Sequence, residues 1–161
     1  MDHDQQTRRQ FCTRACSAAA LAALGGALGT VLQSCGGGSP TTPGGVDAAS
    51  LPTIAGSVAG ASIVVTIDAS SPLAAAGSLA LVRSSAGNVL VARTSQDAFS
   101  ALSTTCTHAA CAITGYSGQT FVCPCHGSQF DTSGRVVAGP APTALRQYTT
   151  RFAGGVLTIT A

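Results

Sequence analysis

Residue types that bind metal ions are concentrated in one part of this chain. The sequence has seven Cys and three His. The segment between residues 106 and 126 contains Cys106, His108, Cys111, Cys123, Cys125 and His126. Thiolate and imidazole groups ligate zinc and iron, and each of two motifs, Cys-x-His at 106–108 and Cys-x-x-His at 123–126, offers one of each. The pattern therefore predicts a metal centre in this segment.

The two motifs carry a family resemblance. They read Cys106-Thr107-His108-Ala109-Ala110-Cys111 and Cys123-Pro124-Cys125-His126-Gly127-Ser128. With their flanks, from about residue 101 to residue 142, they resemble the Rieske iron–sulfur family. The resemblance implies one Rieske-type [2Fe–2S] cluster, with Cys106 and Cys123 on the inner iron and His108 and His126 on the outer iron. Imidazoles in place of two thiolates make such a cluster easier to reduce, so potentials in this class span about −150 to +300 mV.

Zinc is the alternative metal, because two Cys and two His also complete a tetrahedral zinc site. Zinc motifs more often pair Cys with Cys and His with His, whereas both motifs here are mixed and a second cysteine pair accompanies them. We therefore favour the iron–sulfur cluster. An absorption spectrum with thiolate-to-iron bands distinguishes the cluster from colourless zinc.

The resemblance also assigns roles to residues near the ligands. In quinol-oxidising members, the residues matching Cys111 and Cys125 form a disulfide between the cluster loops, which fits an oxidising compartment. The residue matching Ser128 donates its hydroxyl to a bridging sulfide, and the glycine matching Gly127 permits close backbone approach. Phe130 stands where high-potential members usually carry Tyr. Because Phe cannot donate a hydrogen bond, we expect an intermediate potential.

The region from residue 53 to residue 161 is predicted to be all β. Short apolar, β-branched segments alternate with Gly- and Pro-containing turns, which is typical of a sandwich or small barrel. The expected strands cover residues 61–67, 78–83, 89–93, 120–122, 135–137, 146–152 and 156–160, with hairpin turns at 85–88 and 153–155. We expect a small Rieske-type antiparallel β sandwich with a cluster-binding subdomain of two loops. A Gly-Pro-Ala-Pro segment at 139–142 is expected to cover the cluster.

The first 52 residues are predicted to direct export and to tether the domain. Arg8-Arg9 and Phe11 precede an apolar stretch that ends near Leu32, and residues 1–34 resemble a twin-arginine export signal. Leu32 and Cys35 resemble a bacterial lipobox, in which the Cys thiol takes the lipid. The alternative anchor is an uncleaved signal helix. Residues 35–52 are rich in Gly, Ser, Thr and Pro, which predicts a flexible linker.

These features predict an extracytoplasmic, membrane-anchored electron-transfer protein. The formal net charge of +2 argues against a nucleic-acid surface. The first interpretation is a module of a membrane quinol-oxidising system of the cytochrome bc type, with a cytochrome or quinol-oxidising complex as partner. The alternatives are the small subunit of an arsenite-oxidase-like molybdoenzyme and a free-standing lipoprotein shuttle. No pattern outside the metal motifs indicates catalysis by this chain alone.

Overall fold

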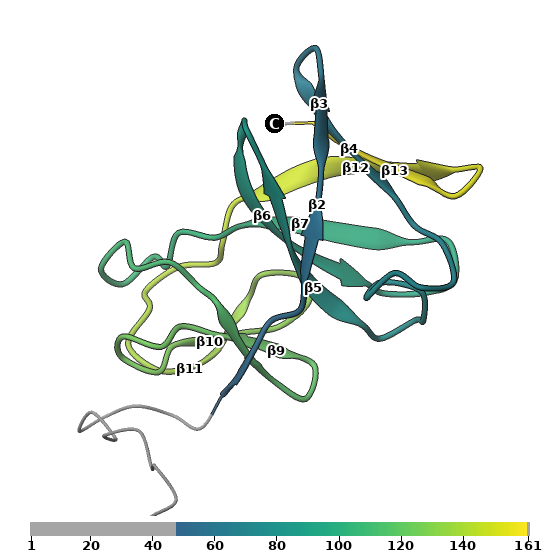
Figure 1. Ribbon diagram of the computed structural model, residues 1–161. Coiled ribbons are helices and arrows are strands. Elements are labelled where there is room, and N and C mark those ends of the chain that lie inside the picture. Colours follow the sequence, from purple (N-terminus) through teal and green to yellow (C-terminus); the bar gives the residue numbers. More distant parts are fainter. Residues whose placement is uncertain (1–47, 161) are drawn as a thin grey trace, which may run out of the picture. The chain divides into compact units, whose positions relative to one another are not determined.

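Residues 48–160 are the part of the chain that the computed structural model describes. They contain thirteen β-strands and no helix (Figure 1), and none of them forms a segment suited to cross a membrane as a helix. The expected export signal at 1–34, the expected lipidation site Cys35 and most of the expected linker lie outside the described residues. The prediction of an all-β domain is confirmed.

The larger sheet has eight strands in the order β2-β5-β6-β7-β12-β13-β4-β3. Their bounds are β2 (Thr53–Ala55), β3 (Ser57–Ala59), β4 (Ser62–Thr66), β5 (Leu79–Ser84), β6 (Gly87–Arg93), β7 (Phe99–Ser103), β12 (Gln147–Ala153) and β13 (Val156–Thr160). The two edge strands, β2 and β3, are separated in the chain by Gly56 alone, so the sheet curls into a nearly closed barrel. A Cβ at Gly56 would lie 2.7 Å from Ile63 Cγ2 and 2.9 Å from Val82 Cγ1, which explains why glycine stands at the closure.

The smaller sheet has five strands in the order β1-β8-β9-β10-β11. Their bounds are β1 (Ala49–Ser50), β8 (Gly115–Ser117), β9 (Thr120–Val122), β10 (Gln129–Phe130) and β11 (Val136–Ala138). Three connections at this sheet carry the predicted site. We call residues 104–114, between β7 and β8, loop 1; residues 123–128, between β9 and β10, loop 2; and residues 139–145, after β11, the proline loop.

Strands β5, β6 and β7 form a wall between two hydrophobic cores. Side chains alternate along a strand, so each of these strands presents one set of residues to the barrel interior and the other to the small sheet. On β5 and β6, the barrel side carries Ala80, Val82, Val89 and Val91, and the opposite side carries Leu79, Leu81, Leu90 and Ala92. Burial of both faces explains why these segments are almost continuously apolar in sequence.

Most of the expected strands are present, and the structure differs from the expectation in two respects. The pair β2–β5 is parallel, although an antiparallel sandwich was expected. The folded unit also begins before residue 53, because Ala49 and Ser50 pair with Tyr116 and Gly115 of β8. Leu51 is only 5% exposed and packs in the core beneath the loops. The end of the expected linker therefore belongs to the domain, because burial of one leucine fixes it there.

Candidate metal centre

Loop 1 is a tight turn built around Cys106. The N–H of Ala110 donates to the Cys106 carbonyl at 2.9 Å, and the N–H of Cys106 donates to the Cys111 carbonyl at 2.9 Å. Ala110 has a φ of 56°, a conformation that costs an L-residue about 1–2 kcal/mol. The N–H of Ile113 donates to the Thr104 carbonyl at 2.8 Å and closes the base of the loop.

Loop 2 repeats the same backbone pattern around Cys123. The N–H of Gly127 donates to the Cys123 carbonyl at 3.0 Å, and the N–H of Cys123 donates to the Ser128 carbonyl at 2.8 Å. Gly127 has a φ of 74° and occupies the position that Ala110 occupies in loop 1. Each loop therefore holds one cysteine in the same kind of turn, four residues before a residue in the left-handed conformation.

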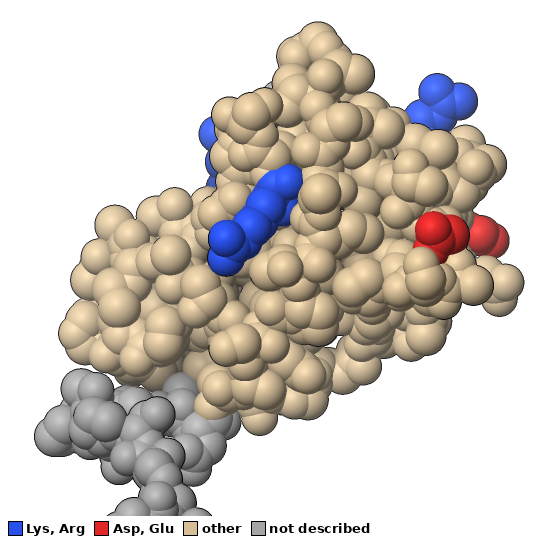
Figure 2. Space-filling model, viewed as in Figure 1, with Lys and Arg blue, Asp and Glu red and all other residues tan. Residues whose placement is uncertain are grey.

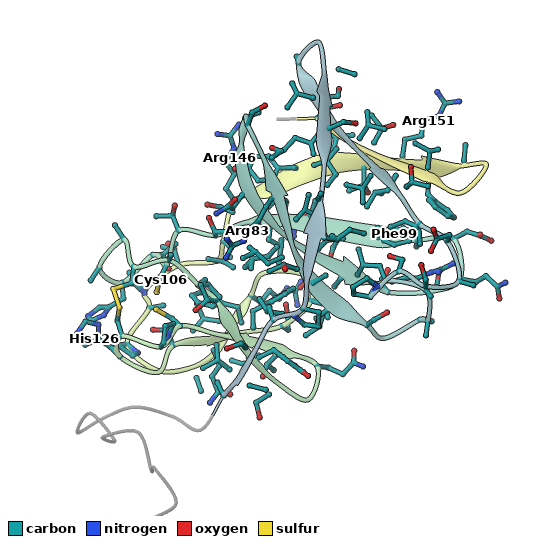
Figure 3. The ribbon with its side chains drawn as sticks, in the orientation of Figure 1. Arg83, Phe99, Cys106, His126, Arg146 and Arg151 are labelled. Carbon is teal, nitrogen blue, oxygen red and sulfur yellow. A yellow bond between two sulfur atoms is a disulfide. The ribbon has the colours of Figure 1, made fainter. Side chains whose placement is uncertain are left out.

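The two loops place thiols inside and imidazoles outside. Cys106 is 2% exposed and Cys123 is 1% exposed, and both are free thiols. His108 and His126 are exposed, with ring centroids 4.7 Å apart and planes at 89° to each other. Figure 3 shows Cys106 and His126 together at one end of the domain. The predicted ligands from both motifs are therefore gathered at one place, as two buried sulfurs and two surface rings.

The Cys123 thiol tends to keep its proton when no metal is bound. Burial raises the pKa of this thiol above its ordinary value, the backbone N–H of Cys125 opposes that effect, and the neighbouring Cys106 thiol adds to it. The net direction is upward. Because metals bind the thiolate, a metal bound here displaces protons from thiols that otherwise hold them.

The four predicted ligands divide by burial into two pairs. The two thiols are buried in the core, and the two imidazoles are exposed. A tetrahedral zinc site requires all four ligands to converge on one point. In a Rieske centre, in contrast, two Cys bind one iron and two His bind the other.

A disulfide joins the two loops. Cys111 and Cys125 are bonded, with their Cα atoms 6.5 Å apart and a sequence separation of 14. This is the pairing that the family resemblance implies. In the chain-entropy description, closing a loop of about this length lowers the entropy of the unfolded chain. This stabilises the folded protein by roughly 3 kcal/mol. The bond therefore holds the two loops against each other independently of any metal.

Ser128 is a buried polar group without a partner in the protein. It is 0% exposed, and its Oγ is the buried side-chain oxygen that lacks a hydrogen bond among the described residues. Leaving a buried hydroxyl unpaired costs about 1–3 kcal/mol, so such a group is expected to serve a ligand. Phe130 follows on β10, is fully buried, and packs in the same core as Cys106 and Cys123.

The proline loop contacts both metal loops. The Thr107 hydroxyl of loop 1 donates to the Thr143 carbonyl at 2.7 Å. At Gly139, where φ is +89°, an added Cβ would lie 2.6 Å from Ser128 Cα and 2.9 Å from the Gly127 oxygen of loop 2. Only glycine allows this approach, so the proline loop packs on the backbone that carries Ser128. Sequence reasoning did not single out Thr107, since a threonine between two ligands carries no distinctive signal.

Three comparisons with known proteins bear on this site. The family model described as "Rieske [2Fe-2S] domain" matches residues 63–149. A cytochrome b6-f complex iron-sulfur subunit from Prochlorococcus marinus (strain AS9601) is 56% identical over 45 residues, which cover 27% of this chain and 25% of that protein. The corresponding subunit of Thermosynechococcus vestitus is 47% identical over 58 residues, covering 35% of this chain and 32% of that protein. The matched part thus spans only about a quarter to a third of these relatives.

Two solved structures are similar to part of this chain. The plasma membrane Rieske protein of Synechocystis PCC 6803 is 32% identical, with a TM-score of 0.46, over 52% of this chain and 86% of that chain. A naphthalene 1,2-dioxygenase is 17% identical, with a TM-score of 0.50, over 60% of this chain and 25% of that chain. The second similarity concerns the fold alone.

Proposed function

The chain belongs to the Rieske [2Fe-2S] domain family, and from this premise we propose that it is an extracytoplasmic electron-transfer protein of a quinol-oxidising, cytochrome bc-type system. The single observation that supports the site most strongly is the pair of matching loops. Each loop holds one buried thiol and offers one exposed imidazole. The Rieske domain implies one [2Fe–2S] cluster.

We assign the ligands as Cys106 and Cys123 to the inner iron and His108 and His126 to the outer iron. The two thiols lie in the hydrophobic core, where water is excluded, and the two rings lie at the surface. The unpartnered hydroxyl of Ser128 fits a donor to a cluster sulfide. The cluster supplies a one-electron couple when bound. The exposed imidazoles supply an edge that a redox partner can reach, and each retains one ring nitrogen for proton exchange.

Spectroscopy and metal analysis of the purified protein test this assignment. We expect thiolate-to-iron absorption bands and equal amounts of iron and acid-labile sulfide. The His108→Asn and His126→Asn variants should lose the cluster, whereas Gln96→Asn, an exposed position in the β6–β7 turn at the opposite end of β7 from loop 1, should keep it. A colourless protein that contains zinc would refute the assignment, as would a cluster that persists in both ligand variants.

The quinol-oxidising branch is supported by the disulfide and by the relatives. Cys111 and Cys125 are bonded, and the curated relatives described above are subunits of a cytochrome b6-f complex. Phe130, in the place where high-potential members usually carry Tyr, weighs against a high potential. Gentle solubilisation of membranes from the source organism tests the proposal. Copurification of the chain with a b-type cytochrome supports it, and copurification with a molybdenum-containing subunit would refute it.

Export and anchoring complete the proposal. The Arg8-Arg9 signal directs the folded domain across the membrane, and the lipid on Cys35 holds it there. Mass spectrometry of the mature protein tests both points: we expect an N-terminus at Cys35 with the added mass of a lipid. If the N-terminus is intact and still includes Arg8, the anchor is an uncleaved signal helix and not a lipid. In that case the Cys35→Ala variant should remain membrane-bound.

A further inference from the structure

Charge is distributed unevenly over the described domain. Residues 98–130 and 136–145, which include loop 1, loop 2 and the proline loop, contain no Arg, Lys, Asp or Glu. The visible face in Figure 2 is uncharged at this end of the domain and carries acidic side chains at the other. Exposed residues of loop 2 and the proline loop include Pro124, Pro140 and Pro142. A partner that contacts the imidazoles therefore meets an uncharged surface, and ion pairs can form only behind it.

Two exposed arginines lie behind this uncharged surface. Figure 3 shows Arg83 near the middle of the domain, between Arg146 above it and Cys106 and His126 at the lower left end, and both arginines are exposed. Arg146 directly follows the proline loop, and its carbonyl accepts the N–H of Ser103, the last residue before loop 1, at 2.9 Å. Arg146 is therefore attached to a segment that adjoins the metal loops, and Arg83 lies on β5, whose Leu79 and Leu81 pack in the core that contains Cys106 and Cys123.

Neighbouring groups restrain the Arg146 side chain and the Arg83 backbone. The guanidinium of Arg146 lies 5.2 Å from the centroid of the Tyr148 ring, an arrangement that restricts the side chain. Arg83 lies within the β5–β6 ladder opposite Asn88, and its carbonyl accepts the N–H of Gly56 at 2.8 Å. Because the Arg146 guanidinium is already restrained by Tyr148, it loses little freedom when a partner binds.

Two of the remaining arginines are engaged within the domain. Arg93 donates to the carbonyls of Leu73 and Ala74 and packs against two aromatic rings. Arg135 has an opposite charge beside it, because its backbone N–H donates to the Asp131 carboxylate at 2.9 Å. Arg151 is exposed at the opposite end of the domain from the metal centre (Figure 3). The cations available to a partner at the metal centre are therefore Arg83 and Arg146.

We propose that Arg83 and Arg146 dock an acidic redox protein whose apolar centre covers the imidazole surface. This inference rests on the proposed electron-transfer function and specifies its partner. One electron passes from the reduced cluster to the partner's one-electron centre, for example a ferric haem that becomes ferrous, and no covalent bond forms or breaks. Complementary charge around an uncharged contact steers association and sets the orientation of the two proteins.

The test compares binding of two c-type cytochromes of similar size, one acidic and one basic. The variants are Arg83→Gln, Arg146→Gln, their double variant, and the matched control Arg151→Gln at the opposite end. Dissociation constants are measured by calorimetry at low and high salt, and electron-transfer rates by stopped flow. Unchanged visible spectra and circular dichroism show that each variant is folded and holds its cluster.

We expect the acidic cytochrome to bind the wild-type protein more tightly than the basic one at low salt. Each single variant at the metal-centre side should weaken that binding by about two- to fivefold, and high salt should remove the difference because exposed charges are screened within about 10 Å. Equal effects of Arg151→Gln, tighter binding of the basic cytochrome, or no response to salt would overturn the docking proposal. A protein without a redox-active cluster would instead overturn the proposed function itself.

Discussion

Replacement of Ser128 by Ala removes the one buried hydroxyl that the described protein leaves without a partner. The side chain is 0% exposed, so bulk solvent does not reach it. If its acceptor is a sulfide of the cluster, the substitution should act in opposite directions on two quantities. It should lower the reduction potential of the loaded protein, and it should leave the cluster-free protein as stable as before or more stable.

The magnitude follows from the energy of a charge-assisted hydrogen bond. Reduction makes the cluster more negative, so the Ser128 hydrogen bond is stronger in the reduced state by about 1–2 kcal/mol. At about 59 mV per 1.4 kcal/mol for a one-electron couple, its loss lowers the potential by roughly 40–85 mV. In the cluster-free protein, the same change removes an unpaired buried hydroxyl whose burial costs about 1–3 kcal/mol.

Protein-film voltammetry measures the first quantity, and urea unfolding of the cluster-free protein with its disulfide intact measures the second. The control is Ser100→Ala, because the Ser100 hydroxyl donates to the Thr132 carbonyl away from the metal loops. This control should lose stability and keep its potential. An unchanged potential in Ser128→Ala, or a cluster-free variant less stable by more than about 1 kcal/mol, would show that the hydroxyl does not serve the cluster.

Three further predictions concern neighbouring residues. Phe130→Tyr should raise the reduction potential by tens of millivolts, about the value of one added hydrogen bond. If voltammetry shows no rise, the residue at position 130 does not influence the potential. Gly139→Ala should destabilise the protein by more than Gly154→Ala, because both have positive φ (+89° and +55°) but only Gly139 lacks room for a Cβ; equal urea midpoints would contradict this. Asp131→Asn should destabilise the protein near neutral pH: burial raises the pKa of Asp131, hydrogen bonds from its own turn lower it more, and the net pKa lies below 3.8. Because a lowered pKa stabilises the fold only above that value, the difference between wild type and variant should shrink as the pH falls below 3.8, and a growing difference would refute the assignment.

Local pattern predicted the hairpins of the domain well. The β5–β6 and β12–β13 pairs were expected from apolar runs around Gly-containing turns, and both form. Strand β7 (Phe99–Ser103) was not expected, although it is a central strand of the larger sheet. Ser100 and Ser103 interrupt its sequence, so β7 lacks the continuous apolar run that identifies β5 and β6. Its place is set by pairing with β6 and β12, which are distant in sequence, and no local signal reports that pairing.

The identity of the site residues was predictable from the motifs, but their support was not. The resemblance supplied the roles of the two Cys–His arms and the pairing of Cys111 with Cys125, and the structure joins that pair. The matching turns at Ala110 and Gly127 were not visible in the sequence, because only one of the two residues is glycine. The contact between Gly139 and Ser128 joins segments that sequence spacing does not relate.

The wall formed by β5, β6 and β7 limits how this protein can be divided. Because its strands bury one face in the barrel and the other beneath the metal loops, removal of either half would leave the wall with a bare apolar face. The small sheet is therefore not a transplantable module, even though its loops resemble an independent metal-binding unit. Tolerance to inserted sequence should be confined to turns far from the wall's covered faces, such as the Gly154–Gly155 turn, where a Cβ at Gly154 meets nothing within 4 Å. An added affinity tag or fluorescent domain belongs at that turn.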